Sequence, residues 1–147
     1  MKHSRTLIVS VFVVASCGLA YELITAALAS YLLGDSIFQY SLIIGLYLFC
    51  MGIGAHLTRY IADKDALARF IETELLVGLL GGLSALFLFT AFGFAAAPFR
   101  TLLYALAGII GTVVGMEIPL VMRVLNNQDW DFKETVARVL TFDYMGA

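Results

Sequence analysis

Apolar residues occur along this chain in four long runs that are separated by short polar stretches. The runs extend from Thr6 to Leu33, from about Ile37 to Leu57, from near Glu74 to Ala97, and from Thr101 to about Val124. A run of about 18 or more apolar residues is long enough to cross a bilayer as a helix. Only helices and closed barrels satisfy their backbone polar groups in lipid, and no period-2 alternation indicates a barrel. The sequence therefore predicts an all-α, polytopic membrane protein with four transmembrane helices.

Turn and loop signals separate these runs. Gly34-Asp35-Ser36 ends the first run, and the polar stretch 58–65 that follows the second run predicts a loop or a surface helix. Between the third and fourth runs, Pro98-Phe99-Arg100 predicts a tight turn, because proline cannot continue the hydrogen-bond ladder of a helix.

The chain changes character after Val124. Residues 126–130 are polar apart from Trp130, an aromatic suited to the membrane interface. Asp131 and Glu134 have the spacing of a capping box, which predicts a helix from Phe132 onward. We therefore expect a four-helix transmembrane domain over residues 1–125. Residues 126–147 are expected to form a cytoplasmic loop and the start of a possible fifth span, at which the chain is truncated.

Composition and charge agree with a membrane protein and exclude several other classes. Hydrophobic residues make up 61% of the chain and charged residues only 14%, whereas soluble domains have about 25% charged residues. The net charge of -2 gives no basic face for nucleic acid, and two cysteines with two histidines indicate neither a disulfide framework nor a metal site. No phosphate-binding loop is present, so no cofactor is predicted.

The distribution of basic residues predicts the orientation, since basic residues are retained on the cytoplasmic side. Arg100 lies on one side of the predicted spans, and all other basic residues lie on the opposite side: Lys2, Arg5, Arg59, Lys64, Arg69, Arg123, Lys133 and Arg138. Both termini are thus expected in the cytoplasm of a bacterium, with the protein in its plasma (inner) membrane. A lipoprotein signal ending at Cys17 is the alternative, but the chain stays apolar from Gly18 to Leu33.

Glu22 is the first candidate functional residue, because ionisable groups inside spans are costly and are functional candidates by default. It lies about 16 residues into the first run, roughly 24 Å from the start. We expect it to face the bundle interior in its protonated form, since burial disfavours a charged carboxyl. The expected hydrogen-bond partners are Tyr47, Thr90 and Tyr104. Both a structural hydrogen bond and a role in binding substrate or protons remain open.

Glu117 is the second candidate, near the cytoplasmic end of the fourth run. Pro119 removes the hydrogen bond to the carbonyl of Gly115, so we expect a kink there. A carboxylate beside a freed carbonyl is suited to a cation or an amine, whereas His56 or Arg59 could instead neutralise Glu117. Because Glu22 and Glu117 differ in depth by more than a helix turn, they are not expected to form an acid/base dyad.

Glycines are placed at intervals that allow close helix packing. The pairs are Gly78 and Gly82, Gly111 and Gly115, and Gly52 and Gly54. This spacing is expected in any tightly packed bundle, so it indicates structure rather than function.

Ordered sequence blocks carry a family resemblance. Residues 16–23 and 29–36 resemble the first helix and turn of membrane-bound spermidine synthase-like proteins, and the blocks 39–46 with 51–54, 74–82, 115–120 with Arg123, and 143–147 are similar to the following helices. The resemblance implies further helices and a soluble aminopropyltransferase domain, which moves an aminopropyl group from decarboxylated S-adenosylmethionine to putrescine. None of that domain's catalytic residues can be placed on this chain.

Three functions follow as hypotheses. The first is the membrane domain or a fragment of such a protein, which anchors it or handles a polyamine or other cation at Glu22, Glu117, Tyr47, Tyr104 and His56. The second is a non-enzymatic helical subunit of a larger membrane complex, and the third is a small cation- or proton-coupled transporter. The expected partners are the bilayer, the missing helices and catalytic domain, or other subunits in a homo- or hetero-oligomer.

The predicted topology can be tested by labelling introduced cysteines with an impermeant reagent. Cysteines at positions 35 and 99 should react from outside the cell, and a cysteine at position 64 should not. Labelling at 64 from outside would reverse the orientation.

Overall fold

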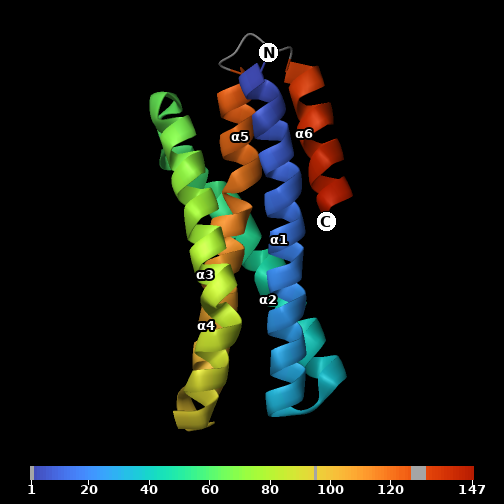
Figure 1. Cartoon of the computed structure of the whole chain (residues 1–147), viewed down its shortest axis with the longest axis vertical. Coiled ribbons are helices and arrows are strands. Elements are labelled where there is room, and N and C mark those ends of the chain that lie inside the picture. The colour runs from blue at the N-terminus through green and yellow to red at the C-terminus, as the bar shows by residue number, and fades with distance from the viewer. Residues whose placement is uncertain (1, 95, 127–131) are drawn as a thin grey trace.

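The computed structural model describes residues 2–94, 96–126 and 132–147, and the regular elements in these ranges are helical. They are α1 (Lys2–Leu33), α2 (Ser36–Leu57), η1 (Thr58–Tyr60), η2 (Asp63–Asp65), α3 (Ala66–Phe94), α4 (Ala96–Gly115), α5 (Glu117–Asn126) and α6 (Phe132–Gly146). The long helices run alongside one another as an elongated bundle, and α6 lies beside the N-terminal half of α1 (Figure 1). The all-α prediction is confirmed for the described residues.

Four helical segments have the length and composition needed to cross a membrane. Among the described residues they are Thr6–Leu33, Ser36–Tyr60, Asp63–Gly93 and Phe99–Asn126. The number of spans agrees with the prediction, but α3 begins eight residues before Glu74. Its first turns form because Ala66 and Phe70 are buried and Arg69 pairs with Glu72 at 2.6 Å.

The turn between α1 and α2 is only two residues long. Gly34 and Asp35 both have positive φ, 75° and 49°, and the Gly34 N–H closes α1 by donating to the Ser30 carbonyl at 3.1 Å. The Asp35 carboxylate then accepts from the Phe38 N–H and caps the start of α2. Glycine is suited to the first of these positions, because it has no Cβ to disfavour a left-handed conformation.

Arg123 holds the polar stretch 58–65 in place. This stretch forms η1 and η2, and the Arg123 guanidinium donates to the carbonyls of Thr58 and Ile61, each at 2.9 Å. Asp63 lies 3.9 Å from the same guanidinium. The predicted loop is therefore a compact connection tied to α5.

The predicted turn at Pro98-Phe99-Arg100 is wrong in position. Pro98 lies in the first turn of α4, which begins at Ala96. Proline is tolerated there because the first N–H groups of a helix have no partner within the helix. Phe99 is buried whereas Arg100 is exposed. A cysteine introduced at position 100 should therefore be more accessible to the impermeant reagent than one at position 99.

The fourth predicted span is interrupted and is not one continuous helix. The α-helix stops at Gly115 and resumes at Glu117, with Met116 in a turn. The Met116 N–H donates to the Val113 carbonyl at 3.1 Å, three residues back, so the end of α4 is tightened. The helix is therefore interrupted three residues before Pro119, close to the predicted position of the kink.

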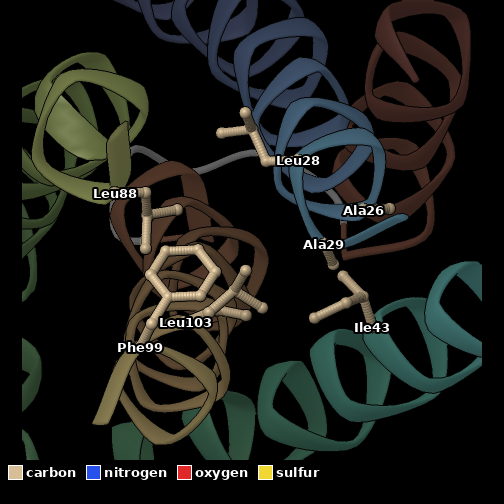
Figure 2. Close-up of a cluster of buried hydrophobic side chains, with 8 residues drawn as sticks. Ala26, Leu28, Ala29, Ile43, Leu88, Phe99 and Leu103 are labelled. Atoms are coloured by element: carbon tan, nitrogen blue, oxygen red, sulfur yellow. The ribbon is translucent and has the colours of Figure 1, made fainter. Parts of the chain in front are cut away.

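Two clusters of buried apolar side chains hold the bundle together at its two ends. Figure 2 shows the cluster near the turn between α1 and α2, where side chains of α1, α2, α3 and α4 meet. Its buried members are Ala26, Leu28, Ala29, Ile43, Leu88, Phe99, Leu103 and Ala107. The second cluster joins α1, α3, α5 and α6 through Val11, Phe70, Leu120, Val121, Leu125 and Val139.

Helices α2 and α4 approach each other at the level of their backbones. A Cβ atom on Gly54 would overlap the Thr112 carbonyl, and one on Gly115 would overlap the Met51 carbonyl. By contrast, no heavy atom lies within 4 Å of where a Cβ would stand on Gly52, Gly78 or Gly82. The packing role expected from spacing is therefore observed for Gly54, Gly111 and Gly115 and is absent for the other three.

The C-terminal helix α6 packs back onto α1. Val139 is fully buried in the second cluster, and a Cβ on Gly146 would overlap the Phe12 carbonyl of α1. The start of a helix at Phe132 is as predicted, whereas the capping box that uses Asp131 and the polar stretch 127–131 lie outside the described residues.

Gly54→Ala should lower the stability of the bundle, whereas Gly52→Ala should not. The added methyl at 54 has to displace backbone, and overpacking of this kind costs about 1–3 kcal/mol. At position 52 the methyl meets open space and improves helix propensity by up to about 1 kcal/mol. Thermal unfolding in detergent measures both; equal melting temperatures would contradict the close approach of α2 and α4.

Candidate functional site

A cavity of about 480 Å³ lies between α1, α2, the α4–α5 junction and α6. Its wall carries three acidic side chains, Glu22, Glu117 and Asp143, each from a different helix. Most of the remaining wall is apolar: Ala15, Leu19, Leu48, Met51, Ala55, Val114, Ile118 and Pro119. The cavity is thus an acidic site in apolar surroundings.

Glu117 is placed in the cavity by the break between α4 and α5. It is the first residue of α5, its side chain is only 2% exposed, and its Oε1 atom has no hydrogen-bond partner. A buried polar group without a partner costs free energy, and a buried charge costs more. An unpartnered carboxyl oxygen in a cavity wall is therefore an acceptor available to a bound cation.

The basic residues expected near Glu117 lie elsewhere. His56 is exposed on α2, and the Arg59 guanidinium lies over the Tyr60 ring, 4.5 Å from its centroid. Neither residue lines the cavity, and in the part of the chain that the structure describes neither forms an ion pair with Glu117.

Glu22 enters the same cavity from α1. Its side chain is 8% exposed, and no hydrogen bond among the described residues involves its carboxyl group. The interior position predicted for Glu22 is confirmed. Glu22 and Glu117, which were expected to differ in depth by more than a helix turn, line one cavity.

The hydroxyl groups expected to bind Glu22 all donate elsewhere. Tyr47 donates to the Gly18 carbonyl at 3.1 Å, and Tyr104 donates to Gln39 Oε1 at 2.8 Å. Thr90 donates to carbonyls of its own helix. The predicted partners of Glu22 are therefore wrong.

Tyr47 still belongs to the cavity wall, whereas Tyr104 does not. Its side chain is 2% exposed and its hydroxyl joins α2 to α1. Of the five residues expected to handle a cation, the structure brings Glu22, Tyr47 and Glu117 together and leaves Tyr104 and His56 apart.

The sequence reasoning missed Asp143. This residue lies on α6, is partly buried, and lines the cavity beside Tyr144. Its carboxyl group, like that of Glu74 on α3, lies within electrostatic range of Glu117. The sequence signal for this site is an acidic residue near the end of a helix with an apolar face. That signal does not show that Asp143 lines a cavity, because its position depends on the packing of α6 against α1.

The arrangement combines acidic groups with an apolar surface. No group of three or more His, Cys, Asp or Glu side chains with metal-binding geometry occurs among the described residues. Carboxyl groups accept hydrogen bonds from ammonium groups, and apolar walls contact methylene groups. A flexible amine combines both kinds of group.

Comparison with known proteins then shows what this chain is similar to. Polyamine aminopropyltransferase 2 of Ralstonia nicotianae is 64% identical over 146 residues, which cover 99% of this chain and 29% of that protein. The polyamine aminopropyltransferase of Leptospira interrogans is 48% identical over 141 residues, with 96% and 28% covered. This chain is homologous to the N-terminal part of the polyamine aminopropyltransferases.

The similarity extends to distant members of that family. The polyamine aminopropyltransferase of Mycobacterium tuberculosis is 37% identical over 153 residues, which cover the whole of this chain and 29% of that protein. The chain thus spans less than a third of the length of these relatives. No family model and no solved structure matches it.

Replacing Glu117 by methionine should stabilise the ligand-free protein. Methionine has a similar volume and removes an unpartnered buried acceptor, so we expect a gain of about 1–3 kcal/mol. Glu72→Met, which removes an exposed ion pair with Arg69, should change stability by less than about 1 kcal/mol. Thermal unfolding without added amine measures both variants. A loss of stability in Glu117→Met would contradict the absence of a partner for this carboxyl group in the ligand-free protein.

Proposed function

We propose that this chain is the membrane segment of a polyamine aminopropyltransferase and that it binds a cationic polyamine between Glu22 and Glu117. The observation that carries the proposal is the Oε1 atom of Glu117, which is buried in a cavity wall without a partner. An ammonium group would offset the cost of burying this carboxyl. The relatives are named for reactions on polyamines, which are chains of ammonium groups joined by methylene groups.

We further propose that the segment anchors the enzyme in the bacterial plasma membrane with both termini in the cytoplasm. The four apolar helical segments support membrane insertion. Helix α5, which carries Arg123, lies towards the end of the bundle that holds the N-terminus, and α4, which carries Arg100 near its start, begins at the opposite end (Figure 1). This asymmetry supports the orientation, because basic residues are retained on the cytoplasmic side. The cavity would then bind the amine that is the substrate or the product of the transfer reaction and keep it at the membrane.

Spermidine titration of the purified protein tests the binding proposal. Glu117→Gln should lower the affinity by at least about 2 kcal/mol, roughly 30-fold, because one partner of a buried charge pair is lost. Glu22→Gln should weaken binding in the same direction. Added salt should weaken binding by the wild type more than by either variant, where the cavity is open to water.

Glu72→Gln is the matched control, since Glu72 is exposed and lies outside the cavity wall. It should leave the affinity for spermidine unchanged. Equal affinities of wild type and Glu117→Gln would leave anchoring as the role of the segment and exclude amine binding at this cavity.

A further inference from the structure

The carboxyl group of Asp143 is the acidic group of the cavity that the proposed function does not use. No ion pair or side-chain hydrogen bond in the described part of the chain involves it, and it lines the cavity together with Glu22 and Glu117. Among the residues that the structure describes, no lysine, arginine or histidine lines this cavity. The described part of the wall therefore carries three carboxyl groups without a basic side chain to balance them.

The basic side chains nearest in sequence to these carboxyls already have other partners. Arg123 donates to two backbone carbonyls of the 58–65 connection, and Arg138 pairs with Glu134 at 2.5 Å on α6. Compensation of the cavity by Arg123 or Arg138 would require those contacts to break. A mobile cation from outside the chain meets no such requirement.

The position of Asp143 depends on a close contact between α6 and α1. Gly146 lies three residues after Asp143, on the same side of the helix, and a Cβ atom on it would overlap the Phe12 carbonyl and crowd the Ala15 side chain. Ala15 itself belongs to the cavity wall. The absence of a side chain at 146 thus allows α6 to close one side of the cavity and brings Asp143 to it.

We infer that Asp143 is a third ammonium-binding carboxylate, which makes the cavity select triamines over diamines. Three carboxyl groups from three helices surround one cavity, and the unpartnered, 2% exposed side chain of Glu117 lies in its wall. A triamine places one ammonium group at each carboxyl and its methylene groups along the apolar wall. A diamine leaves one carboxyl without a cation, so it gains less binding free energy. This inference rests on the proposed function.

The experiment compares spermidine with putrescine, which have three and two ammonium groups, on wild type and on Asp143→Asn. The wild type should prefer spermidine by about tenfold or more. In Asp143→Asn the affinity for spermidine should fall by about tenfold while that for putrescine changes little. The two affinities should then be nearly equal. Asp143→Glu keeps the charge and should keep most of the preference.

Glu72→Gln is again the matched control, because Glu72 is exposed and lies outside the cavity wall; it should leave both affinities unchanged. An unchanged preference in Asp143→Asn, or an equal loss for the two amines, would overturn the inference while spermidine binding by the wild type still supports the proposed function. Failure of the wild type to bind either amine would instead overturn the proposed function itself.

Discussion

The contact between the backbones of α2 and α4 is the interaction on which the rest of the bundle depends. Lipid tails are as apolar as leucine side chains, so helices in a membrane associate mainly through close packing and hydrogen bonds. Gly54, Gly111 and Gly115 provide that packing, because a side chain at any of them would meet backbone atoms of the neighbouring helix. This contact fixes where α4 ends relative to α2, and so it places Glu117 and Tyr47 in one cavity wall.

The interruption of the helix after Gly115 places an acidic side chain, that of Glu117, in the interior of the bundle. Pro119 has no N–H to donate to the Gly115 carbonyl, so the helix cannot continue unbroken through this position. Glu117 therefore occupies the start of a new helix, where the dipole of the following peptide units favours a carboxylate. The residues that break the helix thus also lower the free-energy cost of burying the carboxyl group of Glu117.

Basic and acidic side chains differ in their contacts in this molecule. Arg123 satisfies backbone carbonyls of a connection, and Arg69 and Arg138 pair with exposed glutamates of their own helices. The acidic groups at the cavity have no such partners among the described residues. This difference in partners is the basis for the proposed binding of a positively charged ligand at the cavity.

The sequence by itself determined the four apolar helical segments, the break near Pro119, the helix from Phe132 and the interior position of Glu22, because each follows from local composition or backbone chemistry. The start of α3 and the turn before α4 were misplaced, since side-chain pairing and tolerance of proline extend helices beyond their apolar runs. Only the tertiary structure decided which glycines pack, which groups the Tyr47 and Tyr104 hydroxyls bind, and that Asp143 joins the cavity. The physical reason is that helices which are apolar on all sides carry no pattern to show which face meets a neighbour. Contacts such as Gly146 with Phe12 join residues that are far apart in the chain, and they are set by backbone proximity rather than by any local preference.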